Sequence, residues 1–107
     1  MNEQAYVLTQ GTEKKIDKLV MKQNGQYIHM TFPKGEGLPL HMSNAELFMT
    51  VIRGTLSLGL NDQEVITYKA KTMINIPFQA KMNVRNEHDD ILELIVVKIV
   101  PEGRERI

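Results

Sequence analysis

The chain has 107 residues, of which 42% are hydrophobic and 24% charged, a composition typical of a globular domain. Thirteen basic and thirteen acidic residues cancel, so no net charge attracts nucleic acid or anionic lipid. The absence of cysteine excludes disulfides and thiolate metal sites, and no apolar run approaches the ~18 residues of a membrane span. The first residues do not form a signal-peptide pattern, so we expect one cytoplasmic domain over residues 1–107, without a nucleic-acid or membrane partner.

The first third of the chain reads as short strands separated by turn residues. Residues 6–8 predict an opening strand. Residues 16–21 are apolar at four positions among lysines, a pattern that fits either a strand or one helical turn, so we place an N-terminal strand region at 5–22. Asn24-Gly25 predicts a tight turn, and the next strand follows at residues 27–32.

The middle of the chain has the clearest strand pattern. Residues 47–52 are mostly apolar and end at Arg53-Gly54. Leu56, Leu58 and Leu60 then alternate with small or polar residues, so this strand should bury one face. Asn61-Asp62 predicts the hairpin turn that follows.

The last third predicts three short strands and one long strand. The short strands are expected at residues 65–68, 73–77 and 82–85. Residues 91–100 are almost continuously apolar, which predicts a central strand covered on both faces. Pro101 ends it, and the tail 102–107 is expected to fray.

About nine strands and no convincing helix indicate an all-β domain. Closely spaced strands of this kind must pack face to face or close on themselves to bury their apolar sides. The strand pattern alone does not separate a jelly-roll barrel from an immunoglobulin-like sandwich. The Cys and Trp markers of the immunoglobulin fold are absent, which disfavours the sandwich.

Two stretches of the chain separate these alternatives. The first reads Gly35-x5-His41-x-Ser43-x3-Leu47-x6-Gly54, and the second reads Lys71-x5-Pro77-x-Gln79-x2-Met82-x3-Asn86. Their spacing resembles the two signature motifs of the cupin family, and the resemblance covers about residues 25–100. It implies a small single-domain cupin, whose fold is a jelly-roll barrel (double-stranded β-helix). Lys71 and Gln79 stand where the motif has glycines, so those turns lack the residue that most easily adopts φ > 0.

The same resemblance implies a divalent metal held by three histidines and a glutamate, and most of these ligands are missing. Their slots hold His41, Ser43, Leu47 and Met82. A neutral hydroxyl is a poor ligand, an alkyl group is none, and a thioether does not suit Fe, Mn or Zn. Glu46 adjoins the glutamate slot, but strand alternation points it to the opposite face unless a bulge intervenes. We therefore expect no cofactor; a metal held by His41 and Glu46 is the alternative.

With Leu47 and Met82 filling the former metal cavity, we expect non-catalytic binding of an unidentified small molecule inside the barrel. The residues expected to bind it are His41, Ser43, Leu47, Met49, Met82 and Val84. His41 is either a general base or ligand anchor, or a remnant bonded to a backbone carbonyl. No catalytic residue is assigned.

The sequence leaves two enzymatic functions open as alternatives. One is a metal-dependent cupin of the oxygenase or isomerase type that uses His41 with a rearranged ligand set. The other is a metal-free epimerase with a His base and a Tyr acid, although neither Tyr27 nor Tyr68 has an evident place opposite His41.

The remaining expectations concern the surface. His29 alternates with apolar neighbours and is expected to face solvent or a second chain, and His88 lies in a polar turn and is expected to be exposed. An N-terminal strand at the barrel edge would leave unpaired backbone groups that a second copy could cover, so we predict a homodimer.

Overall fold

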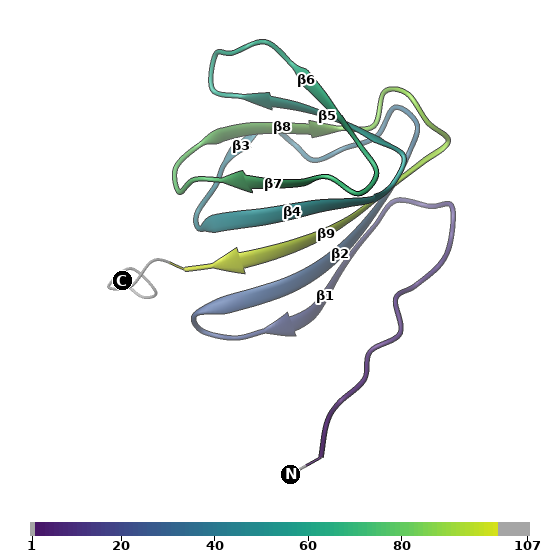
Figure 1. The fold of residues 1–107 in the computed structure, drawn as a ribbon, viewed down its shortest axis with the longest axis vertical. Coiled ribbons are helices and arrows are strands. Elements are labelled where there is room, and N and C mark those ends of the chain that lie inside the picture. Colours follow the sequence, from purple (N-terminus) through teal and green to yellow (C-terminus); the bar gives the residue numbers. More distant parts are fainter. Residues whose placement is uncertain (1, 101–107) are drawn as a thin grey trace.

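The computed structural model describes residues 2–100 as two antiparallel β-sheets that face each other (Figure 1). The five-stranded sheet has the order β1-β2-β9-β4-β7, and the four-stranded sheet has the order β3-β8-β5-β6. The strands are β1 (Lys15–Met21), β2 (Gly25–Pro33), β3 (His41–Met42), β4 (Glu46–Arg53), β5 (Thr55–Leu60), β6 (Ile66–Lys69), β7 (Met73–Ile76), β8 (Lys81–Arg85) and β9 (Ile91–Ile99). Among the described residues no helix occurs that could cross a membrane. The predicted all-β class is confirmed.

The N-terminal region differs from the sequence prediction. Residues 6–8 form no strand, and Val7 is 90% exposed, because three apolar residues without a pairing partner gain too little from ordering. The ambiguous residues 16–21 belong to β1, which pairs with β2. The turn between them is closed by two backbone hydrogen bonds, from Lys22 N–H to Gly25 O (2.8 Å) and from Gly25 N–H to Lys22 O (3.4 Å). The predicted turn is therefore confirmed. The tail 102–107 lies outside the described residues.

The central position predicted for residues 91–100 is confirmed. β9 lies between β2 and β4 and pairs with both over most of its length. Its inward Leu92, Leu94 and Val96 are buried in the apolar core, and the outward Ile91 and Ile95 are also buried. Ile99 is exposed, so coverage on both faces ends before the strand does.

The motif turns adopt the backbone conformation that their family glycines would favour. Gly35 and Gly54 both have φ of 88°, and Lys71 and Gln79 have φ of 76° and 66°. For a residue with a Cβ atom, this conformation costs about 1–2 kcal/mol. Backbone hydrogen bonds to the neighbouring strands, at 2.8 Å for Lys71 N–H and 3.0 Å for Gln79 N–H, offset that cost. At Gly54 an added Cβ would also lie 2.3 Å from Ile91 O, so this turn requires glycine.

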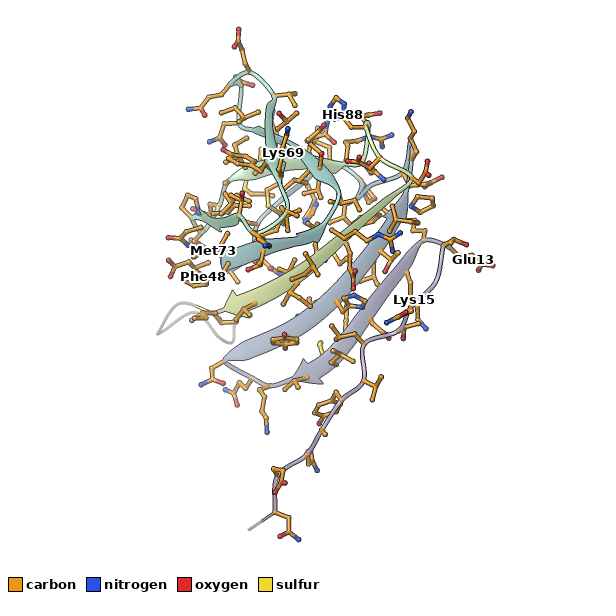
Figure 2. All side chains as sticks on the ribbon, turned by 45° about the vertical axis from the view of Figure 1, so that its right-hand side comes forward. Glu13, Lys15, Phe48, Lys69, Met73 and His88 are labelled. Atoms are coloured by element: carbon orange, nitrogen blue, oxygen red, sulfur yellow. The ribbon has the colours of Figure 1, made fainter. Side chains whose placement is uncertain are left out.

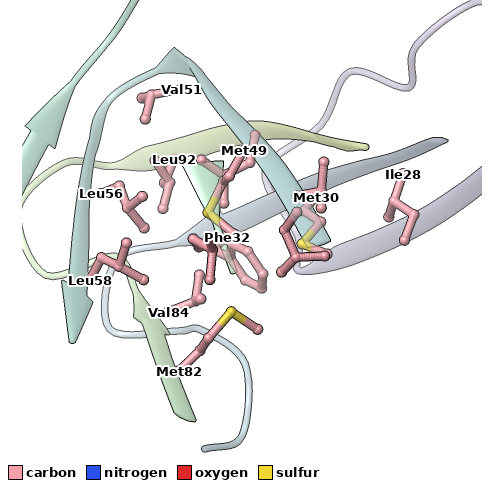
Figure 3. Packing of buried hydrophobic residues seen from close by; sticks show 14 of the residues in the cluster. Ile28, Met30, Phe32, Met49, Val51, Leu56, Leu58, Met82, Val84 and Leu92 are labelled. Carbon is pink, nitrogen blue, oxygen red and sulfur yellow. The ribbon is translucent and has the colours of Figure 1, made fainter. Parts of the chain in front are cut away.

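The hydrophobic core fills the space between the sheets. Figure 3 shows Phe32 near its centre, with Leu56 and Leu58 from the smaller sheet approaching it. Asn86 is fully buried beside the core, where its side-chain nitrogen donates to Phe32 O (2.8 Å) and to Asp89 O (2.9 Å). One end of the barrel is therefore closed by packed side chains and by a hydrogen-bonded turn.

Candidate functional site

The other end of the barrel contains a cavity of about 300 Å³ between the two sheets, which we call the barrel cavity. The five-stranded sheet contributes apolar walls from β2, β4 and β9, and the smaller sheet and the loop before it contribute the opposite wall. Apolar residues lining it include Ile28, Met30, Leu47, Met49, Met82 and Val96. Figure 3 shows Met30 and Met49 on one side of the interior and Met82 on the other. The cavity can therefore hold a small molecule in largely apolar surroundings.

Four of the six residues expected to bind a ligand line the barrel cavity together, namely His41, Leu47, Met49 and Met82. The structure places Ser43 and Val84 outside it. Val84 is fully buried in the core.

Ser43 is buried, and its hydroxyl is fully engaged. The Oγ donates to Pro77 O (2.8 Å) and accepts from Ala80 N–H (2.8 Å), so it fastens the turn between β7 and β8. Its oxygen has a structural role in the described chain.

His41 lies at the exposed rim of the barrel cavity. Its Nδ1 is 2.9 Å from Pro39 O, and because a carbonyl can only accept, Nδ1 carries the proton. This is the backbone-bonded arrangement that the sequence left open beside a role in ligand binding. Nε2 has no hydrogen-bond partner among residues 2–100, so it remains available to a ligand.

The residues at the four metal slots do not fit a divalent ion. Only His41 offers an imidazole, and Ser43 already uses its oxygen. Glu46 alternates with the buried Leu47, and its Oε2 accepts from Asn75 Nδ2 (3.1 Å) outside the barrel cavity. Within the described chain, no group of three or more His, Cys, Asp or Glu side chains could hold a metal.

Two lysines that the sequence analysis did not single out also line the barrel cavity, Lys18 on β1 and Lys98 on β9. Burial lowers the pKa of Lys98 below its ordinary value of 10.5, and the positive charge of Lys18 lowers it further. A signal for Lys98 was present in the sequence, because it continues the inward alternation of Leu94 and Val96. No comparable sequence signal places Lys18 on that face.

The structure contradicts the expectation that His29 faces solvent or a second chain. Its side chain is 2% exposed, and its Nε2 lies 2.6 Å from Glu93 Oε2, on the sheet face away from the barrel cavity. The N-terminal segment crosses near this face, where Thr9 Oγ1 donates to Asp17 Oδ2 (2.8 Å), and Asp17 pairs with His29 in the ladder. His88 is exposed in the turn before β9, as predicted (Figure 2).

No family model matches the chain, but individual proteins similar to it are known. An uncharacterized protein of Methanocaldococcus jannaschii is 40% identical over 85 residues, covering 79% of this chain and 73% of that protein. Its crystal structure, described as an RmlC-like cupin family protein with a double-stranded β-helix fold, covers 94% of this chain and 93% of that chain, with 37% identity and a TM-score of 0.89.

More distant structures agree on the fold alone. A conserved Streptococcus pyogenes protein of unknown function has a TM-score of 0.78 at 19% identity, covering 94% of this chain and 92% of its own. A cupin superfamily protein from Desulfitobacterium hafniense has a TM-score of 0.76 at 10% identity, covering 89% of this chain and 84% of its own. The jelly-roll barrel and the cupin resemblance expected from the sequence are therefore confirmed.

Proposed function

This chain belongs to the RmlC-like cupin family, and we propose that it binds a small, partly apolar molecule in the barrel cavity without catalysing a reaction on it. The observation that carries the proposal is that apolar side chains occupy two of the four positions that would hold metal ligands. Leu47 and Met82 line a cavity of about 300 Å³, a size at the lower end of small-molecule sites.

The chemistry of the walls supports binding of an apolar group. Met30, Met49 and Met82 have unbranched, polarizable side chains that adapt to ligands of different shape. His41 is a polar group at the rim, and with its proton on Nδ1 its Nε2 can accept one hydrogen bond. A ligand with an apolar body and at least one polar atom fits this distribution.

The seven methionines provide a direct test. In protein labelled with carbon-13 at the methionine methyl groups, we expect 1-octanol to shift the signals of Met30, Met49 and Met82. Met21 and Met42 are more than half exposed and lie outside the barrel cavity, so their signals serve as internal controls.

A matched pair of variants locates the binding. Met49→Phe should fill part of the barrel cavity and weaken octanol binding, whereas Thr50→Phe adds a ring on the opposite face of β4 and should not. The proposal fails if octanol leaves the three cavity methyl signals unchanged up to its solubility limit.

We also propose a cytoplasmic homodimer as the working form of this protein. β1 is an edge strand of the five-stranded sheet, with one side unpaired among residues 2–100, and Tyr27 and Ile99 are exposed apolar side chains on the outer face of the same sheet. A second copy related by a two-fold axis could cover both. Sedimentation equilibrium at micromolar concentration should give about twice the chain mass of 12.3 kDa, and a species of monomer mass alone would contradict this.

A further inference from the structure

The two lysines at the barrel cavity lie on the same face of the five-stranded sheet. Lys18 is directly across from Ile28 in the ladder, and Ile28 is across from Val96. Side chains directly across neighbouring strands project to the same face, and so do residues two apart on one strand. Lys98, two residues after Val96, therefore shares the inward face with Lys18 at the open end of the barrel.

Both ammonium groups lack a carboxylate partner among the described residues. The ion pairs in residues 2–100 involve Lys14, Lys15, Lys81, Arg85 and His29, and neither cavity lysine takes part in one. Lys98 is half-buried, and its lowered pKa reflects both the loss of water and the nearby positive charge of Lys18. Two like charges beside an apolar cavity destabilise each other, and a bound anion would relieve that repulsion.

We propose that the ligand of the barrel cavity is an amphiphilic anion, with a carboxylate held by Lys98 and Lys18 and a hydrocarbon body packed against the methionines. This inference rests on the proposed function, because it assigns a chemical class to the molecule bound there. An apolar body matches the walls formed by Met30, Met49 and Met82. The headgroup would sit at the rim, beside the ammonium groups of Lys18 and Lys98.

The distribution of charge and apolar surface disfavours other ligand classes. A cationic ligand would meet two ammonium groups with no acidic side chain lining the barrel cavity. A free inorganic anion would satisfy the lysines but leave the apolar walls without contact. A carboxylate on an aliphatic chain satisfies both regions.

Three probes with the same eight-carbon chain test this, namely octanoate, 1-octanol and octylamine. Each is titrated at neutral pH while the methyl signals of Met30, Met49 and Met82 are followed. We expect octanoate to bind about fivefold or more tightly than octanol, because its carboxylate adds a negative charge opposite the two ammonium groups and a hydroxyl does not. Octylamine, positively charged at this pH, should bind most weakly.

Variants separate the headgroup from the hydrocarbon body. Lys98→Gln should weaken octanoate binding about fivefold and octanol binding much less, and Lys18→Gln should have a smaller effect on octanoate because Lys18 is more exposed. Lys69→Gln removes the same charge from the edge strand β6, far from the barrel cavity, and should change neither affinity (Figure 2). Retained octanol binding also shows that each variant is folded.

The outcomes distinguish this inference from the proposed function. If octanoate and octanol shift the cavity methyl signals with equal affinity, or if Lys98→Gln leaves octanoate binding unchanged, the anionic class is overturned and apolar binding stands. If none of the three probes shifts those signals, the proposed function fails as well.

Discussion

The two ends of the barrel are built from the same strands and have opposite characters. At the closed end, β2 and β9 contribute Phe32 and Leu92, which are fully buried, and Asn86 satisfies the turn with hydrogen bonds. At the open end, the same two strands contribute Ile28 and Lys98, which line the barrel cavity. Dense packing at one end supplies stability, and so the other end can keep a cavity that is incompletely packed.

The largest expected effect comes from shortening one buried side chain at each end of the barrel. Phe32→Ala should lower the free energy of unfolding by about 3–5 kcal/mol, because it leaves a large void in packed surroundings. Met82→Ala should cost less, about 2 kcal/mol, because its site already adjoins a cavity. Urea denaturation followed by circular dichroism measures both, and equal losses would break the comparison.

A smaller loss of stability is expected when the Ser43 hydroxyl, which holds the turn between β7 and β8, is removed. Ser43→Ala should lower the free energy of unfolding by about 1–3 kcal/mol, because Ala80 N–H and Pro77 O would lose their buried partner. Octanol affinity should stay within twofold of the original, a margin that is about 0.4 kcal/mol. A variant that keeps its stability but loses binding would move Ser43 into the site.

A smaller effect concerns Lys98 and its pH dependence. Since its pKa is lowered in the folded chain, the unfolded chain binds more protons between that lowered value and 10.5. At neutral pH the charged Lys98 therefore lowers the free energy of unfolding. This loss of stability becomes smaller as pH rises through the interval.

Lys98→Met should consequently raise thermal stability at neutral pH, and its advantage should shrink as pH approaches 10.5. Lys69→Met, on an exposed edge strand, is the matched control and should show no such trend. An advantage of Lys98→Met that is constant with pH would mean that packing, and not charge, is responsible.

The smallest expected effect is the response to divalent metal. Because the four slots supply one imidazole and no carboxylate toward the barrel cavity, added Fe, Mn, Ni or Zn should not raise the melting temperature. Elemental analysis of protein purified without chelator should find less than stoichiometric metal. Stoichiometric metal that disappears in His41→Ala would overturn the metal-free proposal.

The site could be predicted only in part from the sequence. Positions on the strands were predictable, whereas contacts between residues far apart in the sequence were not. Leu47 and Met82 are placed at the barrel cavity by the motif spacing, and Met49 is placed there because it lies two residues after Leu47 on the same strand. Ser43 occupies a motif slot as well, but its partners lie on the segment from Pro77 to Ala80, and spacing did not reveal that its oxygen is already used.

The all-β class and most strand positions followed from the amino-acid sequence alone, because they depend on local alternation and turn chemistry, and the cupin resemblance followed from the spacing of the two motifs. The burial of His29 beside Glu93 and the meeting of Lys18 and Lys98 at one cavity became known from the folded structure. These neighbours come from strands that are far apart in the sequence. Their proximity depends on the strand order β1-β2-β9, in which a strand from the end of the chain pairs with one from its beginning, and local alternation does not encode that order.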